Sequence, residues 1–568
     1  RLLLKKNVNV DLCDTGGATA LFIACFQGNT SFVSMLLEKN ANIDVCTKNG
    51  SSPLYVASQE GHANVVRLLL ERKPNINLCN IDKVSALAIA SYYGYLTVVS
   101  MLLEKNPYVN FCDKNGCSPL FMASANGHTG VVRLLLERNP NVNLCNREHC
   151  SPLWIAIAKG HTDIVRLLLE RKSNVDLCNI NGCSPLYLVS VKGQTGILRL
   201  LLEKSPNIDL CDIDGNSPQI MASRTGHTSI VRLLLEGNAN INLCDTHGRS
   251  PRIMASWFGH TDVVRLLLEW NANVDLSNAD GISPLLMAIM IGYTDTARLL
   301  LENDPNVDQC DNTGCSPLLM AIQNEHADIV KLLLQKNPNI NLCRDDGFTP
   351  LITSCATNNT SIVQLLIQHN PKPNINAQTN DGGNALYFSS INGNVEITRL
   401  LLENNANCNS CIHGKHYITD ILSNHPTITL DQVKKNCFDC LANNGSSDIK
   451  DYVSRKSADY SFDVEAGSSP LHIACFIGRK DVVSCLLDHH ANINLKKEDG
   501  TTPLFYACEV GHDDIVRLLL GKGADTGICK IDGKFPLTIA IDNGHRSVID
   551  MMKAHILYHM LLVLMGHV

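Results

Sequence analysis

Apolar and polar positions along the chain recur with a period of 33 residues, and each period predicts two short helices. In residues 113–146 a polar turn precedes an apolar stripe that contains Leu120, Met122 and Ala123. A second stripe, residues 130–138, has valine and leucine at the spacing of an amphipathic helix. Helices of this length are unstable alone in water, so we expect each pair to be stabilised by stacking on its neighbours.

Turn and capping residues give the predicted boundaries of each helix. Ser118 can cap the first helix with its hydroxyl, and Pro119 suits the first helical position because no amide donor is needed there. Gly127 ends this helix, where a residue in the left-handed conformation is usual. Asn139 can accept the left-handed cap of the second helix, and Pro140 prevents its continuation.

Fifteen units carry this pattern, each marked by a proline or an alanine at the start of its first helix. These residues are Ala20, Pro53, Ala86, Pro119, Pro152, Pro185, Pro218, Pro251, Pro284, Pro317, Pro350, Ala385, Pro470, Pro503 and Pro536. A repeat of this regularity predicts an array of stacked units instead of several globular domains.

The consensus of the units is Asp-x-x-Gly-x-Ser/Thr-Pro-Leu, then alanine, Gly-His and Val-Val-Arg-Leu-Leu-Leu-Glu, and it resembles the ankyrin repeat over most of the chain. The resemblance implies an all-α ankyrin-repeat solenoid of stacked helix-turn-helix units with short hairpin loops. It also implies that other proteins bind to the concave face. One departure is consistent, because only His472 keeps the family's histidine after Pro-Leu; Tyr55 and Trp154 are examples of the aromatic residues that replace it.

The repeat is interrupted between Ala385 and Pro470, which lie 85 residues apart. Two repeats of 33 residues leave 19 over, and residues 438–463 match a degenerate helix pair. We therefore predict twelve units over residues 1–403, a divergent insert over 404–436, four units over 437–553 of which the first is cryptic, and a helical tail over 554–568. The insert should be the weakest point of the stack.

Composition and charge exclude several classes of protein. Apolar residues make up 45% of the chain and charged residues 18%, which is typical of a folded protein. The net charge of −7 argues against a nucleic-acid partner, because nucleic-acid binding requires a basic face.

The longest apolar run, residues 556–568, is too short to cross a bilayer, so no membrane insertion is predicted in this segment. The chain begins in mid-repeat without methionine, so we expect a fragment of a longer protein.

The 24 cysteines point to a reducing compartment. Eleven of them occupy one phase of the repeat: Cys13, Cys46, Cys79, Cys112, Cys145, Cys178, Cys211, Cys244, Cys310, Cys343 and Cys529. Stacked repeats place successive thiols roughly 8–10 Å apart, which is too far for disulfide bonds. Free periodic thiols fit the cytoplasm or the nucleus.

One group of cysteines could hold a metal. Cys408-x-x-Cys411 and Cys437-x-x-Cys440 are separated by 25 residues, and paired Cys-x-x-Cys motifs can bind zinc. The spacing exceeds the usual range for such sites, and Cys411 falls on the phase of the cysteine ladder. We therefore favour a packing role for the four thiols and predict no metal and no cofactor, with zinc as the alternative.

No catalytic motif is present, so we expect no enzyme. The phosphate loop, the kinase motifs, Gly-x-Ser-x-Gly and His-Glu-x-x-His do not occur. Eight histidines share one phase after the glycine of the first helix: His62, His128, His161, His227, His260, His326, His512 and His545. A hydrogen bond between neighbouring repeats explains them better than eight active sites.

Three units differ from the others in the two residues before this glycine, which are mostly polar elsewhere. They have apolar or aromatic pairs: Tyr92-Tyr93, Trp257-Phe258 and Met290-Ile291. Clustered aromatic residues on an exposed face mark protein interfaces, and the last two pairs, on adjacent repeats, are predicted to form one strip. The alternative is that these side chains pack into the neighbouring repeat as core.

The sequence as a whole predicts a scaffold or regulatory adaptor that binds partner proteins through the concave face of the array. The alternative is the cytoplasmic ankyrin region of a larger channel, kinase or ubiquitin-ligase component. The identity of the partner is not encoded in the repeat framework, because the recurring positions serve stacking.

Overall fold

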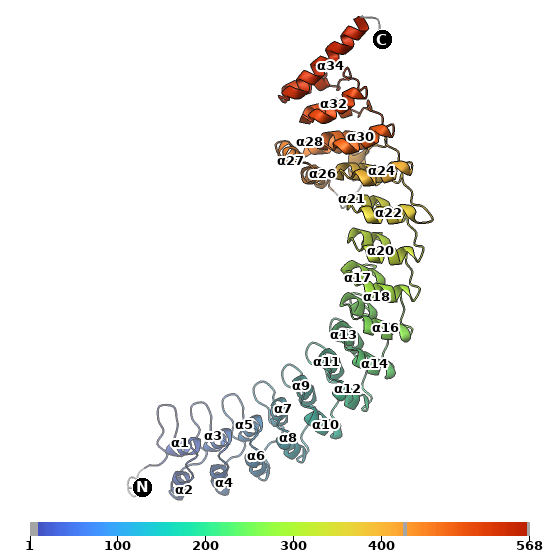
Figure 1. Cartoon of the computed structure of the whole chain (residues 1–568). Coiled ribbons are helices and arrows are strands. Elements are labelled where there is room, and N and C mark those ends of the chain that lie inside the picture. Colours follow the sequence, from blue (N-terminus) through green and yellow to red (C-terminus); the bar gives the residue numbers. More distant parts are fainter. Residues whose placement is uncertain (1–8, 424–428, 565–568) are drawn as a thin grey trace. The chain divides into compact units, whose positions relative to one another are not determined.

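The computed structural model describes residues 9–423 and 429–564 and is all-α, as predicted. It contains 34 helices in this part of the chain, and the only β pairing described there is three isolated bridges. The chain forms two compact units, residues 1–279 and residues 280–568. In both units the helices come in stacked pairs, with the first helices in one layer and the second helices in the other (Figure 1).

The first unit contains eight helix pairs. Their first helices are α1 (Ala20–Phe26), α3 (Pro53–Gln59), α5 (Ala86–Tyr93), α7 (Pro119–Ala125), α9 (Pro152–Lys159), α11 (Pro185–Lys192), α13 (Pro218–Thr225) and α15 (Pro251–Trp257). Their second helices are α2 (Thr30–Glu38), α4 (Ala63–Glu71), α6 (Leu96–Leu103), α8 (Thr129–Leu136), α10 (Thr162–Glu170), α12 (Thr195–Leu202), α14 (Thr228–Glu236) and α16 (Thr261–Glu269).

The second unit contains seven helix pairs and four additional helices. The first helices are α17 (Pro284–Ile291), α19 (Pro317–Gln323), α21 (Pro350–Ala356), α23 (Ala385–Asn392), α29 (Pro470–Ile477), α31 (Pro503–Val510) and α33 (Pro536–Asp542). The second helices are α18 (Thr294–Leu301), α20 (Ala327–Leu334), α22 (Thr360–Gln368), α24 (Val395–Glu403), α30 (Lys480–Asp488), α32 (Asp513–Gly521) and α34 (Arg546–Leu564). The additional helices are α25 (Lys415–Ser423), α26 (Leu430–Asn444), α27 (Ser447–Ser454) and α28 (Ala458–Glu465).

The predicted capping chemistry sets the helix boundaries. The Ser118 hydroxyl accepts a hydrogen bond from the Phe121 N–H at 3.1 Å, and Pro119 follows at the first helical position. Gly160 ends α9 in the left-handed conformation, with φ of 77°. These local signals start and stop the first helices at the same phase, so the buried stripes of successive pairs face each other.

A ladder of side-chain to backbone hydrogen bonds runs along the hairpins that join successive pairs. In ten of the eleven ladder positions the Asn or Asp two residues before the cysteine accepts the backbone N–H of a residue in the next hairpin; the exception is Cys529, which Gly527 precedes. Asn143, for example, accepts from the N–H of Asn174 at 2.8 Å, and Asp176 accepts from that of Asn207 at 3.0 Å. All 24 cysteines are free. This ladder holds successive repeats in register without covalent links.

The interruption is one enlarged hairpin, and this corrects the prediction of a cryptic repeat in the stack. The Ile412 N–H donates to Ser468 O at 3.0 Å. The equivalent bond in an ordinary hairpin runs from the Asp113 N–H to Cys117 O. The bonded residues are four apart in the ordinary hairpin and 56 apart here, so this hairpin holds 52 additional residues. The additional helices α25–α28 form within it.

The stack itself continues directly across this insertion. Helix α23 packs on α29 and α24 packs on α30. The hydrogen-bond ladder also continues, because Asn409 accepts from the N–H of Asn492 at 2.8 Å. A stack of twelve units and a separate stack of four, as predicted from the sequence, are therefore not found. Residues 438–463 form helices that lack the Ser-Pro-Leu start and the leucine stripe of the repeats in the array.

The ends of the predicted domains lie partly outside the described residues, since residues 1–8, 424–428 and 565–568 are not included. The predicted helical tail falls on α34, which runs to Leu564. None of the helices in residues 9–423 and 429–564 combines the length and apolar character needed to cross a membrane.

Candidate interaction surface

The last turns of the first helices, with the loops that follow them, form a surface on one side of each unit, here called the first-helix face. The eight histidines that share one phase hold this face together, as predicted; seven follow a glycine and His326 follows Glu325. In seven of the eight cases the ring Nε2 donates to a carbonyl of the preceding repeat at 2.9–3.3 Å. The eighth, His326, has an Nε2 that is shielded from solvent and has no partner in the described part of the chain.

The glycine and the histidine are required together. A Cβ built on Gly226 would lie 2.6 Å from the His260 ring, and Gly226 has a φ of 75°. The ring therefore lies directly on the preceding glycine, while its Nε2 bonds to Arg224 O at 3.0 Å. In the repeats that have the histidine, this contact fixes the end of the first helix, which carries the residues that differ between repeats.

Tyr92 and Tyr93 lie at the end of α5 and are exposed, at 45% and 46%. Their rings pack edge to face with centroids 5.1 Å apart, and Tyr93 stacks on Tyr95 at 5.9 Å. Tyr95 replaces the usual histidine, and its ring covers Gly61 of the preceding repeat. The three tyrosines form one aromatic cluster on the first unit.

Trp257 and Phe258 lie at the end of α15. Their rings are stacked with centroids 6.0 Å apart, and Phe258 is 41% exposed while Trp257 is half-buried. The Phe258 ring also stacks on His260 at 6.4 Å and lies 5.5 Å from the guanidinium of Arg224. This pair is therefore held in place by its own repeat and by the preceding one.

Met290 and Ile291 end α17 in the second unit, where Ile291 is 43% exposed and Met290 is half-buried. Trp257 and Phe258 belong to the first unit. That the two pairs form one continuous strip therefore stays a prediction. Within its own unit each pair presents at least one exposed apolar side chain on the first-helix face.

A fourth apolar pair at this position, Phe476-Ile477, was missed in the sequence, and it is fully covered. The two side chains are 0% and 3% exposed. Helices α26–α28 lie on the first-helix side of this unit and provide the cover (Figure 1). Tyr452 and Tyr460 from the insert pack on the Phe476 ring at 6.5 and 6.4 Å. The signal was available, since Phe476-Ile477 precedes Gly478 at the phase of the other pairs.

Polar contacts hold the insert against the array. Buried Glu509 of α31 accepts hydrogen bonds at Oε1 from the hydroxyls of Tyr460, at 3.0 Å, and Tyr452, at 3.3 Å. Arg479 stands where other repeats have the histidine. Its Nε donates to Ile391 O at 3.3 Å, and its Nη2 donates to Asn444 O at the end of α26. Arg479 thus makes both the contact between repeats and a contact to the insert.

A buried lysine closes the other end of the insert. Lys497 is 8% exposed, and its Nζ donates to Val464 O at 2.9 Å and to the Tyr506 hydroxyl at 2.7 Å. Burial lowers the pKa of this ammonium group to about 8. The neighbouring His472, the only histidine after Pro-Leu, is fully buried and bonds to Thr501 O at 3.2 Å. Burial lowers its pKa to about 3, so this ring is neutral.

Comparison with protein families agrees with this geometry. The family model for ankyrin repeats, taken in blocks of three copies, matches in overlapping segments over residues 1–411 and 434–558. The chain belongs to the ankyrin-repeat family. Ankyrin repeats are generally modules of protein–protein interaction. A search of curated proteins finds no significant match.

The cysteines of the predicted zinc alternative lie in different environments of this ankyrin array. The Cys408 thiol points to His489 O at 3.7 Å, and the Cys411 thiol contacts Asn409 O at 3.5 Å in the ladder. Cys437 is buried on α26, and Cys440 lies one turn further along the same helix. Within residues 9–423 and 429–564 no group of three or more His, Cys, Asp or Glu side chains is placed to hold a metal ion.

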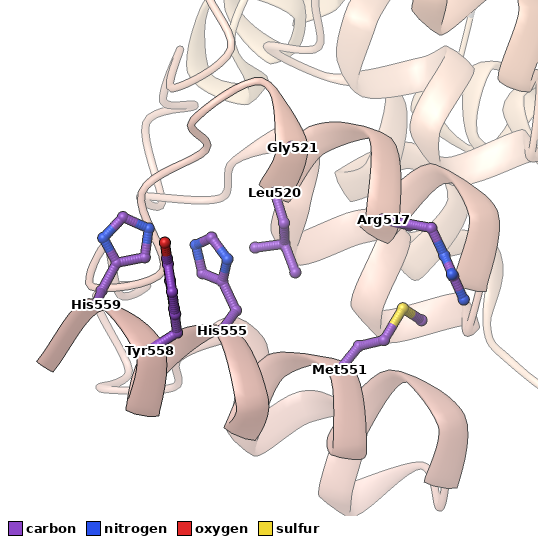
Figure 2. Close-up of a pocket in the computed structure, with 7 residues that line it drawn as sticks. All are labelled: Arg517, Leu520, Gly521, Met551, His555, Tyr558 and His559. Carbon is purple, nitrogen blue, oxygen red and sulfur yellow. The ribbon is translucent and has the colours of Figure 1, made fainter. Parts of the chain in front are cut away.

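The second helices of the last two helix pairs, α32 and α34, line a hollow of about 340 Å³. Arg517 and Leu520 of α32 face Met551, His555 and Tyr558 of α34 across it (Figure 2). The His555 ring lies 4.4 Å from that of His559, one turn further along the helix. Tyr558 and His559 of α34 are exposed on this side.

Proposed function

We propose that this ankyrin array is a scaffold or adaptor that binds partner proteins on its first-helix face and has no catalytic role of its own. The proposal is supported by the exposed aromatic pairs at the ends of α5 and α15, since exposed aromatic clusters are typical of protein interfaces. Their backbone positions are fixed by the contacts between repeats, so little order is lost on binding.

One observation carries the proposal. At the same position of the repeat, Phe476 and Ile477 are covered by helices of the chain itself, whereas Tyr93 and Phe258 are exposed. The array therefore contains an example of its own first-helix face with an occupant. An occupant of similar character, with aromatic side chains that pack edge to face on the pair, fits the exposed positions.

A reducing compartment, the cytoplasm or the nucleus, is part of the same proposal. It is supported by the 24 free cysteines, of which Cys13, Cys343 and Cys529 are exposed. Exposed unpaired thiols are rare in proteins from oxidising compartments.

Replacement of the exposed pairs tests the proposal. The variants Tyr92→Ala/Tyr93→Ala, Trp257→Ala/Phe258→Ala and Met290→Ala/Ile291→Ala are compared with wild type in quantitative capture of partners, with thermal melting as a measure of folding. Trp270→Ala is the matched control, because Trp270 is 43% exposed in the same repeat but follows the second helix. We expect at least one double variant to lose about tenfold in partner affinity with little change in melting, and the control to bind normally. Undiminished capture by all three double variants contradicts the proposal.

A further inference from the structure

Three consecutive first helices of the first unit have a basic residue in their last turn. These residues are Lys159 of α9, Lys192 of α11 and Arg224 of α13. All three side chains are exposed and are here called the basic strip. In the described part of the chain, the other first helices have no basic residue in the last turn. The chain has a net charge of −7, so the strip is opposite in sign to the molecule as a whole.

The basic strip has no acidic partner within the described part of the protein. Lys159, Lys192 and Arg224 take part in none of the ion pairs between described residues. Asp212, in a hairpin of the same unit, accepts from the backbone N–H of Asn216 at 2.8 Å and from its side-chain amide at 3.1 Å. A cation at a helix C-terminus stabilises the helix slightly, but the other first helices form without one.

Apolar side chains accompany the strip. Trp154 of α9 and Tyr187 of α11 are half-buried, and the Trp154 Nε1 donates to Cys183 O at 3.0 Å, which fixes its ring across two repeats. At the other end the Arg224 guanidinium lies 5.5 Å from the Phe258 ring. The strip thus leads directly to the exposed aromatic pair, and the face is both cationic and apolar.

We propose that the first-helix face of α9–α15 binds an extended acidic segment of a partner protein. Its carboxylates would recur at every third residue, and an aromatic or branched apolar side chain would follow them onto Trp257 and Phe258. The spacing follows from geometry, because stacked helices lie roughly 8–10 Å apart and three extended residues span about 10 Å. This inference rests on the proposed function and specifies the chemistry of its partner.

A nucleic acid fits this face less well than an acidic segment. The strip offers three cations, and the exposed hairpin residues Glu148 and Asp214 of the same unit would repel phosphates. Nucleic-acid binding requires an extended basic surface. A segment with discrete carboxylates needs only the three cations of the strip.

Selection of random 12-residue peptides displayed on phage, with the full chain as target, tests the proposal. We expect enriched peptides with Asp or Glu at three-residue intervals followed by an aromatic or branched residue. Affinity of the synthetic peptides should fall about tenfold in Lys159→Glu/Lys192→Glu/Arg224→Glu and decrease with added salt. The matched control is Arg166→Glu/Arg199→Glu/Arg232→Glu, which makes the same change of charge on exposed residues of the second helices in the same repeats. It should bind as wild type does, and thermal melting should show both variants folded.

Each other outcome has a defined meaning. One outcome is that the enriched peptides lack acidic residues, bind the basic-strip variant normally and fail to bind Trp257→Ala/Phe258→Ala. This outcome overturns the inference and leaves the proposed function intact. Peptides indifferent to both variants, or no enrichment, count against both. A labelled oligouridylate that binds the strip more tightly than the acidic peptides assigns it to RNA and overturns the inference.

Discussion

At the scale of single residues, two consecutive repeats have a polar residue where the others have a leucine, which is buried in all but the last repeat. Gln219 is 0% exposed, and neither its Nε2 nor its Oε1 has a hydrogen-bond partner in the described part of the chain. Arg252 is 1% exposed and donates from Nη2 to Ala272 O at 2.7 Å, while its Nε and Nη1 are without partners there. Burial lowers the pKa of this guanidinium group to about 10. Both residues weaken the core, because buried polar groups without partners are costly.

Gln219→Leu should therefore stabilise the first unit. Removal of two unpaired buried polar groups, with a side chain that neighbouring repeats accommodate, is expected to raise the free energy of unfolding by about 1–3 kcal/mol. Urea unfolding measures the effect. The reverse change at the same position of the preceding repeat, Leu186→Gln, should lower stability by a similar amount or more. Equal stability of Gln219→Leu and wild type would mean that the amide is satisfied in solution.

The histidines show what can be predicted for single residues and what cannot. Their shared phase predicted a hydrogen bond between repeats, and seven of eight make it. Arg479 at the same phase was not recognised, because its second contact, to Asn444 O, depends on the position of the insert. The sign of the basic strip was visible in the sequence, but its lack of acidic partners among the described residues required the structure.

At the scale of elements, helix α28 ends in a carboxyl group whose protonation changes near neutral pH. Glu465 at its end lies beside the thiols of Cys437 and Cys440, and its Oε1 is shielded from solvent. Burial raises the pKa of this carboxyl group to about 8, and the nearby Asp381 adds to the shift. The carboxyl group is thus protonated in the folded protein at neutral pH.

Stability of the second unit should fall as pH rises from about 6.5 to 8. The unfolded chain loses the Glu465 proton near pH 4.5 and the folded protein near pH 8, so the folded state binds more protons between these values and stability decreases. His472 acts in the opposite sense, but only between about pH 3 and its unfolded value of 6.5. Glu465→Gln should remove a decrease on the order of 1 kcal/mol over roughly pH 6.5–8. Chemical unfolding at several pH values measures it, and parallel profiles for wild type and variant would contradict the assignment.

The regular helices could be predicted because each carries its own capping and stacking signals, and their phase is the same in every repeat. The path of the insert could not. Its length is compatible with an additional repeat, and the return of the chain to where it left is visible only in contacts of the folded protein, such as the hydrogen bond from Ile412 to Ser468 and the packing of α23 on α29. Helices α26–α28 have no repeat-like stripe, because they pack sideways on Tyr387, Phe476 and Tyr506 and not between neighbours.

At the scale of the whole molecule, the array should persist without its insert. In the proposed variant a three-residue turn, Lys-Asn-Gly as in residues 114–116, replaces residues 413–467. The hydrogen bond between Asn409 and Asn492 and the packing of α23 on α29 are expected to remain. Exposure of Phe476 and Ile477 should lower the free energy of unfolding by about 3–6 kcal/mol and increase binding of a hydrophobic dye. Circular dichroism and denaturant titration check that the variant folds.

Adding Phe476→Gln/Ile477→Asn to the shortened chain is the control, because polar residues at these positions should return dye binding to the level of the intact protein. Unfolding of the repeats on either side of the new turn would show instead that the insert is an integral part of the stack.

The closed ends of the enlarged hairpin have a consequence for the evolution of such arrays. One hydrogen bond of 3.0 Å joins the residues at which the chain enters and leaves the insertion, and this bond forms whatever the number of residues between them. Every ordinary hairpin closed in the same way, such as that from Asn179 to Cys183, offers an equivalent entry point for a foreign segment. A lineage can thus gain or lose whole folded modules at these turns in single genetic events, and only the repeats that the module covers, as at Phe476 and Ile477, need to change with it.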